Sequence, residues 1–189
     1  MKTTIALTAD IVRFLESGDR KVMRKVNRWR APRWIRIWMV CATRGGDGWL
    51  WYTLGAFTLA FGGESRLTAL TAAVLAVLTG IALFLWLKKR IGRKRPCAVE
   101  PHCWHTLLPP DQFSFPSGHT ITAFGVAMTL SHFYPSLSVG LCFCAFSVAI
   151  SRVLLGMHFV SDVLAGAALG SALAYGSARV VMCIVKMLP

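Results

Sequence analysis

Long apolar stretches that lack charged side chains alternate with short polar segments along the chain. Residues 67–87, LTALTAAVLAVLTGIALFLWL, are 21 consecutive residues without a charge, about the length that spans the hydrocarbon core of a bilayer. The 32 residues from Thr120 to Ser151 also contain no Asp, Glu, Lys or Arg, which suits two spans joined by a turn at 134–136. This pattern predicts a multi-pass membrane protein.

The apolar stretches predict an all-α transmembrane helical bundle of about five spans, or six if the N-terminal segment hides another. A first, short apolar run covers 48–63 and carries aromatic residues at its start, as membrane interfaces favour. The third span begins near Ser117, the fourth near Ser136 and the fifth near Phe159. Small residues at four-residue intervals in the fifth span predict a face for close helix packing. They are Gly166, Gly170, Ala174 and Ala178.

The first 44 residues differ from the rest of the chain because they are rich in positive charge. They contain eleven Lys and Arg residues, and their apolar residues recur at helical spacing. We predict an amphipathic helix on the membrane surface, with Asp19 as the N-cap of a helix that starts at Arg20. An ordinary helix packed on the spans is the alternative. The predicted domains are a basic segment over 1–44 and a transmembrane domain over 45–189.

The net charge of +13 raises the question of a nucleic-acid partner. Basic residues that flank membrane spans face lipid head groups, and the chain has no zinc-finger spacing or other nucleic-acid motif. We therefore expect the bilayer as a partner and no nucleic acid. Residues 1–30 also lack the apolar core and cleavage site of a signal peptide.

Two polar stretches fall at one membrane face when the spans are drawn in order. The end of the second span offers Lys88 and Arg95, and the third span begins with Ser117, Gly118 and His119. A helix N-terminus with Ser and Gly suits an anion, although a capped helix with an interfacial histidine is the plainer alternative. The remaining cations after the second span are interpreted as a plain basic flank. They are Lys89, Arg90, Arg93 and Lys94.

A third polar stretch, at the junction of spans four and five, reaches the same face. It carries Arg152, His158 and Asp162. His158 and Asp162 are four residues apart and would share one face of a helix, so the carboxylate could orient the imidazole and stabilise its cation. A solvated histidine beside a capping aspartate is the alternative. Together the three stretches predict a site that binds a phosphate and performs acid–base and nucleophilic chemistry on it.

The three stretches together resemble the signature of the type 2 phosphatidic acid phosphatase (PAP2) family, which shares its fold and anion site with vanadium haloperoxidases. The resemblance covers roughly residues 45–178. The motifs are Lys88-x6-Arg95-Pro96, Pro116-Ser117-Gly118-His119 and Ser151-Arg152-x5-His158-x3-Asp162.

The resemblance implies hydrolysis of a phosphate ester without a metal or other cofactor. It implies that His158 attacks phosphorus and forms a phosphohistidine, that Asp162 orients His158, and that His119 protonates the leaving oxygen and then activates water. The implied ligands of the phosphate oxygens are Lys88, Arg95, Arg152, Ser117 and the Gly118 N–H. The implied substrate is a lipid phosphate or diphosphate that enters sideways between the spans. Candidates are undecaprenyl diphosphate, phosphatidylglycerophosphate, phosphatidate and a lipid A phosphate.

Two cysteines and two histidines lie in the loop before the third span. Cys97 and Cys103, with His102 and His105, match no common metal-site spacing. A Cys97–Cys103 disulfide is the better interpretation if the loop is extracytoplasmic. We expect no metal site.

The membrane side of the site receives two opposite predictions. With five spans, the basic N-terminal segment and the site share a side, and the positive-inside rule then favours the cytoplasm. The family resemblance implies the outer face of the membrane, which we take to be a bacterial cytoplasmic (inner) membrane. The sequence leaves the side, the lipid and the oligomeric state open.

Other functions remain as alternatives to a lipid phosphatase. A lipid phosphotransferase would pass phosphate from the same histidine to another lipid. Haloperoxidase chemistry belongs to soluble relatives, and five spans argue against it. A non-enzymatic transporter or scaffold would place ionisable residues at mid-span, whereas the candidate residues gather at span ends.

Overall fold

The computed structural model describes residues 16–99 and 111–187, and these ranges are almost entirely helical. A first helix covers residues 16–28. In the described ranges the only β-type pairing is a bridge between Lys94 and Phe113. The all-α prediction is therefore confirmed. The further helices are α2 (Arg33–Arg44), α3 (Leu50–Phe61), α4 (Arg66–Ile91), α5 (Pro96–Val99), α6 (Gly118–Phe133), α7 (Ser138–Leu154) and α8 (Val160–Met187).

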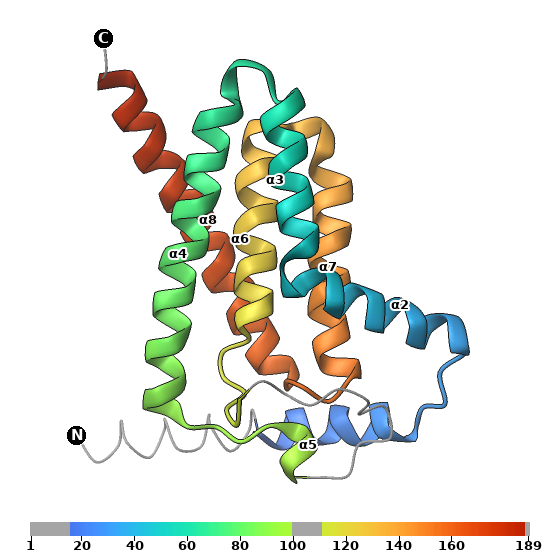
Figure 1. Ribbon diagram of the computed structural model, residues 1–189. Helices are drawn as coiled ribbons and strands as arrows, with labels where there is room; N and C mark the ends of the chain where they lie inside the picture. The colour runs from blue at the N-terminus through green and yellow to red at the C-terminus, as the bar shows by residue number, and fades with distance from the viewer. Residues whose placement is uncertain (1–15, 100–110, 188–189) are drawn as a thin grey trace, which may run out of the picture.

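Five of these helices, α3, α4, α6, α7 and α8, stand side by side as a bundle (Figure 1). Three helical segments among the described residues are long and apolar enough to cross a membrane, namely Gly63–Ile91, Pro135–Leu154 and Val160–Met187. Many large apolar side chains are exposed on the outside of the bundle, such as Leu78 and Leu164. A surface of this kind is stable in hydrocarbon, and the chain is an integral membrane protein. The prediction of five spans stays a prediction.

Helix α6 lies at the centre of the bundle and packs on α4, α7 and α8. Glycines on α8 permit the closest approach. A Cβ at Gly170 would lie 2.4 Å from the carbonyl oxygen of Ile121, and one at Gly166 would lie 2.9 Å from that of Ser117. Ala174 and Ala178 continue this face and are buried. The predicted small-residue face is confirmed, and it brings the start of α8 against the start of α6.

The described part of the N-terminal segment forms two helices rather than one. The helix over 16–28 crosses the lower end of the bundle in Figure 1, and α2 follows after a break that contains Pro32. Asp19 lies inside the first helix, so the prediction that it caps a helix starting at Arg20 was wrong. Met23 of this helix is only 3% exposed and belongs to the bundle core. Its basic residues remain exposed.

Candidate active site

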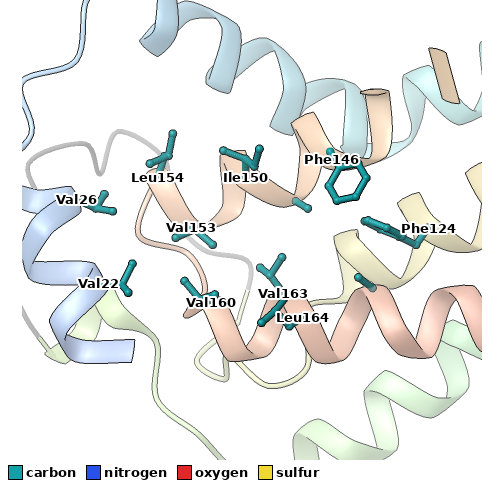
Figure 2. A pocket seen from close by; sticks show the side chains of 12 residues that line it. Val22, Val26, Phe124, Phe146, Ile150, Val153, Leu154, Val160, Val163 and Leu164 are labelled. Carbon is teal, nitrogen blue, oxygen red and sulfur yellow. The ribbon is translucent and has the colours of Figure 1, made fainter. Parts of the chain in front are cut away.

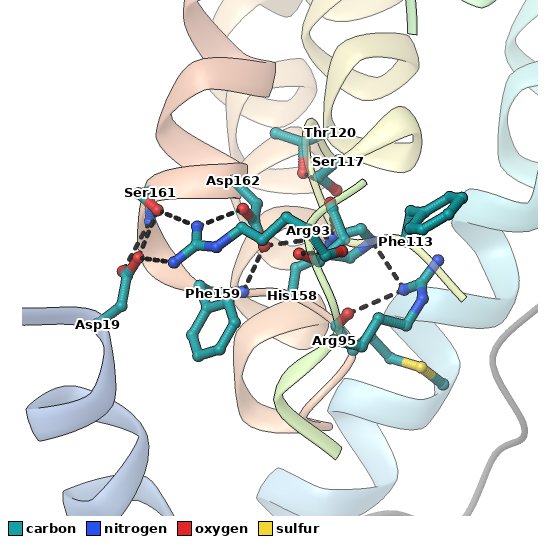
Figure 3. A network of polar contacts seen from close by, with 12 residues as sticks. Asp19, Arg93, Arg95, Phe113, Ser117, Thr120, His158, Phe159, Ser161 and Asp162 are labelled. Atoms are coloured by element: carbon teal, nitrogen blue, oxygen red, sulfur yellow. Dashed lines mark hydrogen bonds and ion pairs between the residues drawn. The ribbon is translucent and has the colours of Figure 1, made fainter. Parts of the chain in front are cut away.

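The predicted site residues gather at one end of the bundle, the lower end in Figure 1. This end contains the last turn of α4, the segment around Arg95, the first turn of α6 and the turn between α7 and α8. The two short turns at 62–65 and 134–137 lie at the opposite end. Side chains that are far apart in sequence therefore meet because the helices alternate in direction. Figure 3 shows part of the resulting polar network.

His158 is buried in the turn before α8, with 1% of its surface exposed. Its Nδ1 lies 2.6 Å from the carbonyl oxygen of Ser114, and its Nε2 lies 3.2 Å from Nη1 of Arg95. A carbonyl can only accept and a guanidinium can only donate. Nδ1 must therefore carry the proton, and Nε2 presents its lone pair toward Arg95.

Electrostatics keep the His158 ring neutral. Burial lowers the pKa of His158 to about 3, the charges of Arg152 and Arg95 act in the same direction, and Asp162 opposes them. A neutral imidazole with an unprotonated Nε2 is the form of histidine that acts as a nucleophile.

Asp162 lies beside His158 but beyond hydrogen-bond distance, unlike what the four-residue spacing on one helix predicts. The distance from His158 Nδ1 to Asp162 Oδ2 is 3.8 Å, because α8 begins at Val160 and His158 lies outside the helix. Oδ2 of Asp162 accepts instead from the N–H of Phe159 (2.8 Å), and Oδ1 accepts from Arg93 (2.7 Å). The expectation of a shared helix face was wrong.

Lys88 and Arg95 are brought together by a residue that the sequence did not indicate. Lys88 Nζ lies 2.6 Å from Oδ2 of Asp111, and Arg95 Nη2 lies 2.8 Å from Oδ1. Burial alone would raise the pKa of Asp111, but the hydrogen bonds and charges of Lys88 and Arg95 lower it to about 2. The Asp111 carboxylate thus forms charge-assisted hydrogen bonds with two of the cations that were predicted to bind phosphate.

Arg152 is buried at the end of α7, with 3% of its surface exposed. Its Nη1 donates to the hydroxyl of Thr43 at 2.6 Å, whereas its Nε has no hydrogen-bond partner among the described residues. A buried guanidinium with an unused donor is costly unless a ligand completes it. This feature fits an anion site.

The start of α6 supplies the remaining predicted residues. Ser117 is fully buried, and its N–H donates to the carbonyl oxygen of Asp162 at 3.2 Å. Gly118 is the first helical residue, so its N–H belongs to the turn whose donors have no partners inside the helix. The backbone there can bind an anion.

His119 pairs with an aspartate that lies 72 positions away. Its Nε2 lies 2.7 Å from Oδ1 of Asp47, in the segment between α2 and α3. Because a carboxylate only accepts, Nε2 carries a proton, and Nδ1 is the ring nitrogen left for another partner. Asp47 is 42% exposed at its side chain.

Sequence reasoning missed several residues that build the site. Arg93 was interpreted as part of a plain basic flank. That interpretation was wrong, because Arg93 forms an ion pair with Asp162. One signal was present in the sequence. The chain has only 8 acidic residues, so each of them was a candidate partner for the predicted cations and histidines. Four of them line this end of the bundle. They are Asp19, Asp47, Asp111 and Asp162.

The fold and the site together define a membrane-embedded bundle with a cluster of cations and two hydrogen-bonded histidines at one end. The PAP2 superfamily model matches residues 67–185, and the chain belongs to this superfamily. The family resemblance drawn from the three motifs is confirmed.

Comparisons with individual proteins agree with this assignment. The chain is 34% identical over 89 residues to the lipid A 1-phosphatase of Rhizobium johnstonii, a match that covers 45% of this chain and 36% of that protein. The crystal structure of Aquifex aeolicus LpxE superposes with a TM-score of 0.72 at 28% identity, covering 84% of this chain and 93% of that one. A transmembrane PAP2-type phosphatidylglycerolphosphate phosphatase from Bacillus subtilis gives a TM-score of 0.68 at 27% identity, covering 92% and 87%. The chain spans little more than a third of the length of the Rhizobium relative.

The proposed Cys97–Cys103 disulfide stays a prediction. Cys103, His102 and His105 lie outside the described residues.

Proposed function

We propose that this protein is an integral-membrane phosphatase that hydrolyses a lipid phosphate or diphosphate through a phosphohistidine at His158. The observation that carries the proposal is the tautomer of His158, whose Nε2 lone pair faces Arg95 inside a group of cations. A phosphate bound by those cations would meet the lone pair directly. The phosphatase names of the matched relatives support the same class of reaction.

In the first step Nε2 of His158 attacks phosphorus, and the bond from phosphorus to the leaving oxygen breaks. His119, protonated on both ring nitrogens and paired with Asp47 through Nε2, gives its Nδ1 proton to the leaving oxygen. The phosphorylated ring then carries a positive charge, which the Asp162 carboxylate stabilises from 3.8 Å. Ser114 keeps Nδ1–H engaged through its carbonyl oxygen.

In the second step water attacks phosphorus and His119 takes its proton. The N–P bond breaks, phosphate leaves and His158 returns to its neutral form. Lys88, Arg95 and Arg152 bind the non-bridging oxygens together with Ser117 and the N–H of Gly118. Phosphoryl transfer depends on such positioning and positive charge, and this chain's residues supply both without a metal ion.

The lipid chains of the substrate remain in the bilayer while the phosphate reaches the end of the bundle. Lipid A phosphates and phosphatidylglycerophosphate are the substrates that the names of the matched proteins favour. Undecaprenyl diphosphate and phosphatidate stay in the same chemical class. The membrane we propose is the cytoplasmic membrane of a bacterium, because these matched proteins are bacterial.

The test is phosphate release by the detergent-purified protein from a panel of lipid monophosphates and diphosphates with EDTA present. We expect release by the native protein and a loss of at least about ten thousandfold in His158→Ala, since the nucleophile is gone. His132→Ala is the matched control, because His132 is an exposed histidine at the opposite end of α6. It should retain native activity.

Three outcomes would overturn the proposal in different ways. Release that requires a divalent metal would exclude the metal-independent mechanism. Labelled phosphate that appears in a second lipid, instead of in solution, would identify a phosphotransferase. Absence of release from every lipid by the folded protein would exclude the phosphatase function.

A further inference from the structure

The Arg93 guanidinium lies between two buried carboxylates at the active-site end of the bundle. Its Nη1 donates to Oδ1 of Asp162 and its Nη2 to Oδ2 of Asp19, each at 2.7 Å. The side chains of Asp162 and Asp19 are 0% and 5% exposed. Figure 3 shows Arg93 reaching from Asp162 to Asp19. One cation therefore joins a residue of the PAP2 motif to one near the N-terminus.

The second carboxylate comes from the helix over 16–28, which lies outside the matched region of 67–185. Both the backbone N–H and the hydroxyl of Ser161 donate to Asp19. Arg93 Nη1 also donates to the Ser161 hydroxyl at 2.7 Å. Three donors thus hold Asp19 against the first turn of α8.

These contacts determine where the Asp162 carboxylate can lie. One oxygen is held by Arg93 and the other by the N–H of Phe159, and the Arg93 guanidinium stacks 4.2 Å above the Phe159 ring. Phe159 directly follows His158 in the chain. A shift of Arg93 would therefore move the Asp162 carboxylate relative to the His158 ring, whose Nδ1 lies 3.8 Å from Oδ2 of Asp162.

The charge balance of the group also depends on Asp19. Two carboxylates share one guanidinium, so the group keeps a net negative charge beside His158. A positively charged phosphohistidine is stabilised by that charge. Without Asp19, Arg93 would neutralise Asp162 fully.

We infer that Asp19 and Arg93 are positioning residues for the catalytic carboxylate, so that the N-terminal helix is a working part of the active site. The inference rests on the proposed phosphatase function. It concerns residues that touch neither the phosphate-binding cations nor His158 among the contacts described. Asp19 acts through Arg93 and Ser161, and Arg93 acts through Asp162.

The test is a double-mutant cycle on the full-length protein in detergent, with steady-state kinetics on the best lipid substrate. We expect Asp19→Asn to lower kcat about tenfold and Arg93→Gln about a hundredfold, the scale of a small misplacement of catalytic groups. KM should stay unchanged, because neither residue binds the phosphate. The double variant should lose no more than Arg93→Gln alone, since Asp19 acts through Arg93.

Matched controls separate this role from general effects of charge or folding. Glu16→Gln changes a partly exposed acid on the same helix, and Lys89→Gln changes an exposed cation of the same basic run. Both should keep the native kcat. If Arg93→Gln does not fold, Arg93→Lys is the substitute variant. It keeps the charge without the two-pronged geometry, so it should still lower kcat and leave KM unchanged. Thermal unfolding of each variant verifies that the assay temperature lies well below its Tm.

Several results would overturn the inference. They are a native kcat in Asp19→Asn, losses that multiply in the double variant, and a change confined to KM. These results require an active native protein. Absence of phosphate release by the native protein would instead contradict the proposed function itself.

Discussion

The two histidines of the site are each associated with an aspartate, but in opposite ways. His119 bonds Asp47 directly at 2.7 Å, at a side chain that is 42% exposed. His158 lies 3.8 Å from the fully buried Asp162 and donates Nδ1–H to the carbonyl oxygen of Ser114 instead. The distant pair in sequence forms the hydrogen bond, and the pair four residues apart does not.

The difference shows that orientation and charge are supplied separately to His158. A backbone carbonyl sets the tautomer, and Asp162 contributes mainly negative charge from a position held by Arg93. At His119 one carboxylate supplies both, because it contacts the ring directly. Figure 2 shows an apolar cavity of about 360 Å³ between the helix over 16–28, α7 and α8, lined by Val22, Val153 and Val163 among others.

Among the variants that test this comparison of the two histidines, Asp162→Asn should have the largest effect on kcat. We expect kcat to fall about a thousandfold, less than the roughly ten thousandfold seen where an aspartate also sets the tautomer of its histidine. The measurement is kcat at saturating lipid, with Glu64→Gln as a control at the opposite end of the bundle. A loss equal to that of His158→Ala would mean that Asp162, and not Ser114, orients the ring.

An intermediate effect should come from Asp47. Asp47→Asn keeps an acceptor for Nε2 of His119 but removes the charge, so we expect kcat to fall about tenfold. The pH profile of kcat/KM should move to lower pH, because the imidazolium loses a carboxylate while the cations Arg152 and Lys88 still face it. Asp47→Ala should lose more activity, since it also removes the acceptor that orients the His119 ring. An unchanged profile in both variants would exclude a role for Asp47 in proton transfer.

The smallest effect should come from Asp111→Asn. A phosphate that binds Lys88 and Arg95 would displace the Asp111 carboxylate, so the variant should lower KM about threefold, the scale of a partly exposed ion pair. Inhibition by inorganic phosphate should strengthen in parallel while kcat stays constant. A raised KM would mean that Asp111 holds the two cations in place.

The effect of Asp111 should also be independent of pH in the usual assay range. The pKa of this carboxyl is lowered to about 2, so the group stays ionised above that value. Its contribution to stability is present above the ordinary carboxyl range and is lost as the pH falls through about 2. The matched measurement is KM for native protein and Asp111→Asn across mildly acidic to neutral pH.

Much of the fold could be predicted from the sequence because its elements follow local rules. Charge-free runs located the helices of the bundle to within a few residues, and small residues every fourth position located the α8 face that packs on α6. The N-terminal helices were harder to predict. Their amphipathic spacing was visible, but the burial of Met23 and Asp19 depends on contacts with the bundle.

The sequence by itself determined a membrane bundle and three motifs whose cations and histidines reach one end of it. These features are local, since they depend on apolar length and on the order of residue types along the chain. Only the tertiary structure decided which partner each group has. Arg93 meets Asp162 and Asp19, and His119 meets Asp47, across 69 to 74 positions of sequence. Such pairings arise when helices pack, and no spacing within one helix encodes them.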